Sequence, residues 1–233
     1  MRRGGLLFAC SLLLAGCARQ APTWISIESR LLPEPQRSVS DTAAIETRDD
    51  GYSVNFGDCQ LFVKAVSDRA LNRQFVGVSY RGEDSANPYT FGNWMDPELG
   101  YTPPRFTVFW LEMSGAGDCL ARLEDLKLTT DRGDTLSAYR YRSLGPHALL
   151  DRLEQDWPGR GDLLREAEGI LEQTYAWRSE GMLELNRGYV VFDPLDYAVD
   201  RVSLVLSWQA GDSLAQAVLA FRQHLARHEE PSR

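Results

Sequence analysis

The sequence has no surplus of positive charge. It contains 33 Asp and Glu residues against 25 Lys and Arg residues, which gives a net charge of −8. Such a chain lacks the basic surface that neutralises phosphates along a duplex, so we expect no nucleic-acid partner. The 233 residues, 43% hydrophobic and 25% charged, suffice for one domain with a substantial core. This composition excludes collagen-like, coiled-coil and wholly disordered chains.

The usual catalytic and cofactor motifs are also missing. The sequence has no Gly-x-Ser-x-Gly elbow, no His-Glu-x-x-His, no Walker loop, no Gly-x-Gly-x-x-Gly and no Cys-x-x-Cys. His224 and His228 have a spacing that could hold a metal from one face of a helix, but the arginines beside them favour an exposed segment. His147 has no obvious acidic partner in the sequence. We therefore expect no enzymatic activity, no bound metal and no cofactor.

The N-terminal apolar run is too short to cross a membrane as a helix. It extends from Leu6 to Ala15, about ten residues, and follows the positive tripeptide Met1-Arg2-Arg3, which is the order of an export signal. It ends in Leu14-Ala15-Gly16-Cys17, which resembles the lipobox of bacterial lipoproteins.

The lipobox resemblance implies three expectations. Residues 1–16 would be removed as a signal peptide, Cys17 would carry the lipid, and the protein would be anchored to a bacterial membrane. We place it at the outer membrane, facing the periplasm. Several acyl chains give stable anchoring where one is marginal. The alternative is an ordinary secretory signal cut near Ala18 or Ala21.

We interpret residues 17–51 as the lipidated N-terminus and a tether. They contain several prolines and many polar residues and have no long apolar periodicity. Within them, Trp24, Ile25 and Ile27 predict a short strand that docks on the body of the protein. We assign residues 52–228 to one domain and residues 229–233 to a tail.

Alternation with a period of two predicts strands from Tyr52 onward. The runs end at Gly, Pro, Asn or Asp, and Thr130–Thr135, which contains Gly133, predicts a hairpin turn. The expected strands lie around residues 52–56, 61–65, 75–80, 106–110, 123–130, 136–141, 189–192 and 202–208.

Two other segments show helical spacing. Leucines and alanines recur every three or four residues within an insertion at about 146–177, where Pro158-Gly159 divides two short helices and Asp162 is a plausible N-cap for the second. Ser213 with Gln216 makes a capping-box pattern. An apolar stripe follows it, so the sequence predicts a C-terminal helix. The stripe comprises Leu214, Ala217, Val218, Phe221 and Leu225.

These patterns together predict a mainly β fold. Short antiparallel strands joined by hairpin turns are typical of a β-sandwich. Four segments carry a further resemblance, to the immunoglobulin-like domains of uncharacterised envelope lipoproteins. They are Pro104-Arg105-Phe106-Thr107-Val108-Phe109, the hairpin from Leu126 to Leu136, Gly188-Tyr189-Val190-Val191-Phe192, and Val202 to Trp208. The resemblance implies an immunoglobulin-like antiparallel sandwich with an inserted helical pair and a C-terminal helix, and it implies no activity.

Two of the four cysteines remain to pair after processing, because Cys10 leaves with the signal and Cys17 carries lipid. We expect Cys59 and Cys119 to form a disulfide in an oxidising compartment, where a bridge that closes so long a loop contributes roughly 4 kcal/mol. Two buried thiols are the first alternative. A metal site built from the two Asp-Cys pairs is the second, although the cysteines lack zinc-site spacing.

The segment from Arg81 to Pro104 is the best candidate for partner binding. It carries Tyr89, Phe91, Trp94 and Tyr101 on a proline-rich loop, and aromatics on such loops add contact area at small entropic cost. The alternative is that these aromatics fold back onto the core. The same loop has oxygen-bearing side chains of the kind that calcium prefers, although their spacing matches no known calcium loop. They are Glu83, Asp84, Asn87, Asn93, Asp96 and Glu98.

The tripeptide Arg-Gly-Asp occurs twice, at residues 132–134 and 160–162. Each copy has a structural use, as a hairpin turn and as a helix start, so we do not expect integrin binding. The sequence therefore favours a membrane-anchored envelope lipoprotein that acts as a non-catalytic interaction or assembly module, with an envelope protein or glycan as partner. The alternative is a periplasmic lipoprotein that binds a small ligand or a metal.

Overall fold

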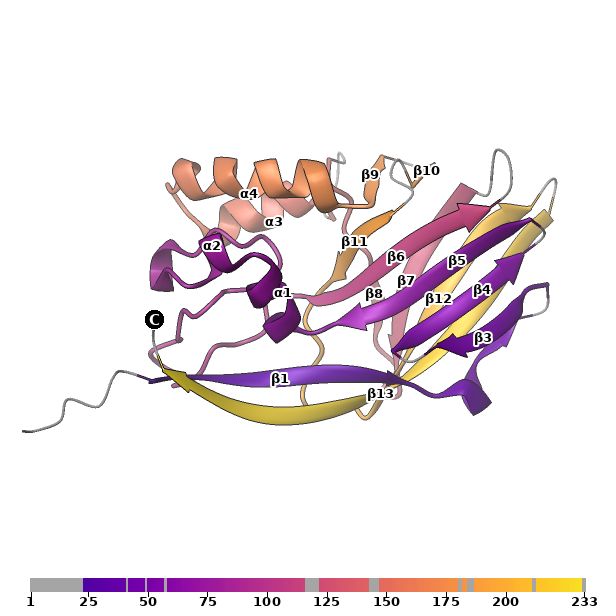
Figure 1. Ribbon diagram of the computed structural model, residues 1–233, viewed down its shortest axis with the longest axis horizontal. Coiled ribbons are helices and arrows are strands. Elements are labelled where there is room, and N and C mark those ends of the chain that lie inside the picture. The colour runs from indigo at the N-terminus through magenta and orange to yellow at the C-terminus, as the bar shows by residue number, and fades with distance from the viewer. Residues whose placement is uncertain are drawn as a thin grey trace, which may run out of the picture.

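The protein is a β-sandwich of two antiparallel sheets, with its helices gathered at one end (Figure 1). The computed structural model describes residues 23–40, 42–48, 50–56, 58–115, 122–142, 147–179, 182–183, 187–210 and 213–231. The prediction of a mainly β sandwich is confirmed, whereas the immunoglobulin-like topology stays a prediction. Within the described residues, no helix combines the length and the apolar composition needed to cross a membrane.

The first sheet has the strand order β1-β13-β12-β7-β8, and β2 also pairs with β13. Its longest members, β1 and β13, run side by side along one side of the molecule (Figure 1). The strands are β1 (Thr23–Pro33), β2 (Val39–Ser40), β7 (Arg122–Thr130), β8 (Thr135–Ser137), β12 (Arg201–Ala210) and β13 (Ser213–Pro231).

The second sheet has the order β11-β6-β5-β4-β3. Strands that follow one another in sequence are mostly neighbours in this sheet, since β3 pairs with β4 and β4 pairs with β5. The strands are β3 (Ala44–Arg48), β4 (Gly51–Phe56), β5 (Cys59–Val66), β6 (Thr107–Gly115) and β11 (Arg187–Phe192). A separate small hairpin joins β9 (Trp177–Ser179) and β10 (Met182–Leu183).

Aromatic side chains from both sheets fill the space between them. Tyr52 of β4 packs edge-on against Phe221 of β13, with ring centres 5.2 Å apart. The Tyr52 hydroxyl also donates a 2.6 Å hydrogen bond to the Ala220 carbonyl. Phe56 stacks on Trp208 at 4.8 Å. Each buried aromatic removes a large apolar area from water, and the paired rings add attraction, so this layer holds the sheets together.

The α-helices cover the end of the sandwich from which β1 starts (Figure 1). The predicted pair within 146–177 is confirmed as α3 (Leu149–Asp156) and α4 (Gly161–Thr174), divided by Pro158-Gly159. Asp162 is the second residue of α4 and Arg160 is the N-cap. The expected strand at 75–80 is wrong, because this segment is helical. The remaining helical elements are α1 (Asp68–Gln74), α2 (Val76–Ser79) and the 3-10 turns η1 (Pro35–Arg37) and η2 (Gly82–Asp84).

The predicted C-terminal helix is wrong, because Ser213–Pro231 forms the strand β13. Its residues alternate between buried and more exposed positions as well as recurring at helical spacing, so the pattern fits both structures. Partners decide between them: β12 pairs with the first half of β13, and β1 pairs with the second half. Each half of β13 therefore has a partner strand for its backbone groups, and the two partners overlap at Phe221 and Arg222. Its core-facing set is Ala215, Ala217, Leu219, Phe221 and Gln223.

The predicted tether is also corrected, because most of it belongs to the sandwich. The expected short strand at Trp24–Ile27 is the start of β1, which pairs with β13 over its whole length. Residues 39–48 supply β2 and β3. The signal peptide, Cys17 and the rest of residues 1–22 lie outside the described residues.

Candidate functional site

A cavity of about 330 Å³ opens between the two sheets where they meet the helical end. Five separate segments line it: the second half of β1, Asp50 before β4, the end of β5 with the start of α1, the start of β6, and Leu195 before β12. The walls are mostly apolar. Leu31, Phe106, Val108 and Leu195 are buried there, whereas Leu32 is 47% exposed.

Charged side chains stand around this apolar interior. The Lys64 ammonium lies 3.2 Å from a carboxylate oxygen of Asp50. The Arg30 guanidinium lies 3.2 Å from Glu28, which is 2% exposed and also sits 2.6 Å from the His228 imidazole. Solvent-exposed ion pairs are worth about 1 kcal/mol or less. Lys64 could therefore exchange Asp50 for an acidic group of an incoming molecule at little cost.

Asp68 is the most perturbed acid of the cavity. Burial, and then the negative charge of Glu28, raise the pKa of Asp68 to about 7. Burial also acts on Glu28, but hydrogen bonds with Ser67 and Arg30 outweigh it and leave the pKa of Glu28 below its ordinary value. At neutral pH, Asp68 is thus the carboxyl group that can hold a proton, while Glu28 stays ionised.

The variant Asp68→Asn is expected to flatten the pH dependence of stability between about pH 4 and pH 7. The pKa of an unfolded aspartate is 3.8, so in this interval the folded state holds a proton that the unfolded state has released. Stability falls with rising pH wherever the folded state binds more protons. We expect the wild type to lose up to about 4 kcal/mol that the variant does not lose, as measured by urea unfolding at both ends of the interval.

Asp50→Asn is the matched control, because Asp50 is solvent-exposed and contributes only an exposed ion pair. The free energy of unfolding of this variant should change with pH in parallel with that of the wild type. A parallel profile for Asp68→Asn as well would contradict the assignment of the raised pKa to Asp68.

The predicted partner-binding loop is folded onto the body of the protein. Tyr89 is 0% exposed, and its hydroxyl lies 2.6 Å from the Thr174 hydroxyl of α4. The prediction that Tyr89 contacts a partner is therefore wrong. Phe91 packs against Trp94 at 5.5 Å, and Tyr101 lies 6.3 Å from the Tyr197 ring. Phe91, Trp94 and Tyr101 are only half-buried, so the fold-back alternative describes Tyr89, and partner contact by the other three aromatics stays a prediction.

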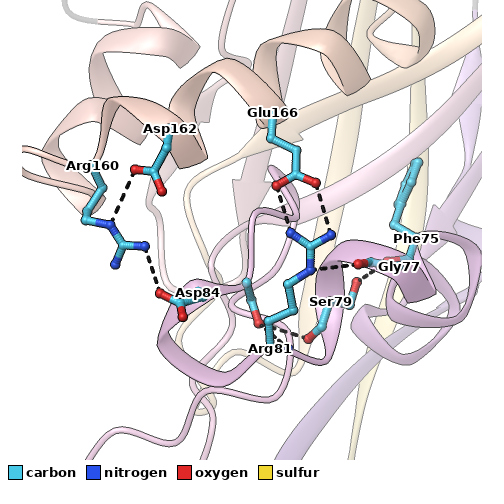
Figure 2. Close-up of polar contacts among 9 residues, drawn as sticks. Phe75, Gly77, Ser79, Arg81, Asp84, Arg160, Asp162 and Glu166 are labelled. Atoms are coloured by element: carbon cyan, nitrogen blue, oxygen red, sulfur yellow. Dashed lines mark hydrogen bonds and ion pairs between the residues drawn. The ribbon is translucent and has the colours of Figure 1, made fainter.

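Two arginines fasten this loop to α4 (Figure 2). Arg81 contacts Glu166 through two N–O pairs of 2.8 and 3.1 Å, and its Nε donates to the Gly77 carbonyl at 2.8 Å. Arg160 lies 2.7 Å from Asp84 and 3.5 Å from Asp162. The Arg-Gly-Asp at 160–162 is thus engaged in internal contacts, and the copy at 132–134 forms the β7–β8 hairpin turn.

The oxygen-bearing side chains of the loop do not form a cation site. Asn93 accepts a 2.7 Å hydrogen bond from the Gly82 amide, Asn87 donates to the Ser79 hydroxyl, and Asp96 accepts from the amides of its own turn. Across the described ranges, no cluster of three or more His, Cys, Asp or Glu residues could hold a metal ion.

The histidine pair is likewise separated. His224 and His228 lie on a strand, where four residues span about 13 Å, and His228 contacts Glu28. His147 packs edge-on against Tyr139. None of the three therefore joins a second histidine as a metal ligand.

The predicted disulfide is tested only at one end. Cys59 is half-buried at the start of β5, where it pairs in register with Gly115 near the end of β6. Cys119 lies outside the described residues. The bridge between Cys59 and Cys119 stays a prediction.

Sequence reasoning missed the cavity and a buried cation behind it. Arg105 is 1% exposed, and its guanidinium lies 4.3 Å from the ring centres of both Phe91 and Trp157. It also contacts Asp156 at 3.4 Å and donates a 2.9 Å hydrogen bond to the Asn87 carbonyl. The only signal in the sequence was an arginine between Pro104 and an apolar strand.

No protein family, no curated protein and no solved structure matches the chain.

Proposed function

We propose that the protein is a lipid-anchored lipoprotein of the bacterial envelope that acts as a non-catalytic interaction or assembly module and holds its partner in the cavity lined by β1 and β5. The cavity is the observation that carries this proposal. Its apolar walls come from strands of both sheets, so the site is preformed. A preformed apolar site with a few charged groups at its rim is typical of binding sites.

The lipobox resemblance supports the anchor, and the position of β1 limits how far the sandwich could lie from a lipid on Cys17. Five residues separate Cys17 from Thr23, where β1 begins. Even fully extended, the six steps from Cys17 to Thr23 span no more than about 22 Å. A lipid on Cys17 would therefore keep the sandwich close to the membrane, and we place the protein at the outer membrane, facing the periplasm.

The anchor is tested by labelling cells with radioactive palmitate. The full-length protein should incorporate the label, and Cys17→Ser should not. Cys10→Ser is the matched control, because Cys10 would leave with the signal peptide, and it should be labelled like the wild type. An unlabelled wild-type protein would contradict lipidation at Cys17.

The interaction site is tested by photocrosslinking in cells. A photoreactive residue in place of Leu32, at the open side of the cavity, should give a discrete adduct of defined mass. The same residue in place of Val39, which is 60% exposed on β2, should not. Ala65→Phe, which fills the cavity, should abolish the Leu32 adduct, whereas Ala44→Phe on the exposed strand β3 should preserve it. No adduct, or one that persists after the cavity is filled, would contradict the proposal.

A small-ligand protein is the second candidate, because the cavity volume lies at the lower end of the range for small-molecule sites. In that case the Leu32 position would give no protein adduct. A panel of small amphipathic molecules would instead raise the melting temperature of the wild type and leave that of Ala65→Phe unchanged.

A further inference from the structure

β1 is the end strand of its sheet, and one of its edges lies along the cavity. Its other edge pairs with β13 in unbroken register from Thr23 to Pro33. Backbone groups of a strand point alternately to its two edges. The Glu34 amide continues this register by donating to the Ala220 carbonyl at 2.8 Å, so the even-numbered residues of β1 face β13.

The odd-numbered residues of β1 therefore face the free edge. The Ile25 carbonyl confirms this direction, because it accepts a 2.7 Å hydrogen bond from the Thr102 amide on the side away from β13. By the same alternation, the N–H and C=O groups of Ser29 and Leu31 point away from β13. Both residues line the cavity.

The chain begins to cover this edge and then leaves it. Thr102 forms a parallel bridge with Ser26, but the next two residues are Pro103 and Pro104. Proline has no N–H group, so it cannot continue the pairing. Within the part of the chain that the structure describes, no strand pairs with β1 beside Ser29 and Leu31 on this side.

A second open edge lies across the cavity. β4 begins at Gly51, which pairs with Lys64 of β5. β5 continues for two more residues, Ala65 and Val66, which pair with β6 on their other side and also line the cavity. The cavity thus lies between two strand edges, on β1 and on the end of β5, beside which no strand of the described part of the chain pairs. Exposed strand edges act as templates for another strand.

We propose that the cavity takes an extended peptide segment of an envelope partner, which adds a strand along the free edge of β1 at Ser29 and Leu31. The inference rests on the proposed function, since it names the kind of partner that the cavity holds. Backbone hydrogen bonds to Ser29 and Leu31 supply the pairing, as in other cases of strand addition.

The side chains of the segment alternate between two faces. One apolar side chain enters the cavity between Leu31, Phe106 and Leu195. Arg30 and Lys64 line the same groove beside Asp50 and Asp68. Because Asp50 is exposed and holds Lys64 only by an exposed ion pair, an acidic residue of the segment can replace Asp50 as the partner of Lys64.

The test is selection of random dodecapeptides displayed on phage against the full-length protein in detergent. We expect enriched peptides that combine an apolar residue with acidic neighbours. Methylating alternate backbone nitrogens of a synthetic copy should weaken binding at least tenfold, because one edge of the peptide then has no N–H donors. Its side chains are unchanged, so contacts that depend on side chains alone would leave the affinity as it was.

Variants of Ser29 test the protein side of the pairing. Ser29→Pro removes the outward N–H without touching a donor that faces β13, and it should weaken binding at least tenfold. Ser29→Thr keeps the N–H and should bind normally. If Ser29→Pro does not fold, the methylated peptides still decide the question.

No enriched peptide, or equal affinity of methylated and unmethylated copies, would overturn strand addition. The crosslink from position 32 tests the proposed function independently of strand addition. An adduct that depends on the cavity, together with failed strand addition, would leave the interaction module in place and reject only the extended-peptide partner.

Discussion

Arg105→Met is expected to lower the free energy of unfolding by about 3–5 kcal/mol, because it leaves a buried charge without its main partner. Burial lowers the pKa of Arg105 to about 10, so its guanidinium is still charged at pH 7. Methionine would fill much of the space between Phe91 and Trp157, but it would leave the Asn87 carbonyl without its donor. Asp156 would keep only Arg152, at 3.5 Å.

Guanidinium chloride unfolding of the wild type and the variant measures this loss. Arg81→Met is the matched control, because Arg81 makes a two-bond contact with Glu166 in which both side chains are exposed. Exposed pairs contribute about 1 kcal/mol or less. The prediction fails if the two arginine variants lose similar stability.

Gly92→Ala is expected to cost about 3 kcal/mol or more, because the loop crosses another segment of backbone at this residue. A Cβ at position 92 would lie 2.0 Å from the Ser79 carbonyl oxygen and 2.7 Å from the Ser85 hydroxyl. Relieving this clash means moving a carbonyl that accepts hydrogen bonds from the Asn93 amide and from Ser85. Gly92 also has a φ of +64°, which is unfavourable for alanine.

Gly100→Ala separates the clash from the backbone conformation. Gly100 has a similar φ of +71°, but among the described residues nothing beyond its own chain neighbours lies within 4 Å of where a Cβ would stand. We expect this variant to cost about 1 kcal/mol, the conformational part alone. Thermal or chemical unfolding of both variants gives the comparison, and a Gly92→Ala protein as stable as Gly100→Ala would show that the loop is not built into the fold.

Local patterns sufficed for much of the sandwich and for the helical pair. Tyr52–Phe56 and Val202–Trp208 alternate clearly and form strands β4 and β12, and Leu163, Ala167 and Leu171 form the buried stripe of α4. In each case one periodicity prevails, so the local sequence and the tertiary structure agree.

Segments compatible with two structures could not be predicted in this way. Residues 213–231 fit both a helix and a strand, and the choice depends on β1, which lies some 190 residues earlier in the chain. Local propensity is a weak guide where such long-range pairing decides. The sequence of β1 itself resembles a tether, since its apolar residues are interrupted by Glu28 and Arg30. These two charges contact each other, and Glu28 also contacts His228 and Ser67.

The candidate site could not be predicted at all from the sequence. Its lining comes from separate segments, and its defining feature is a backbone edge rather than a side-chain motif. The aromatic loop attracted attention because aromatic residues are abundant there. Composition alone does not say whether a ring faces solvent or packs on the core, and Tyr89 packs on the core. Pro103 and Pro104 end the pairing of Thr102 with β1. This role could not be predicted, because it depends on the position of Thr102 beside Ser26 in the folded protein.

Whether the cavity holds a partner is decided by the photocrosslink from position 32 in living cells, compared between the otherwise wild-type protein and Ala65→Phe. If the protein holds an envelope partner in the cavity, position 32 gives a discrete adduct that disappears when the cavity is filled and never forms from position 39. An adduct that is absent, or that forms equally with the cavity filled, would contradict a partner-binding role for the cavity.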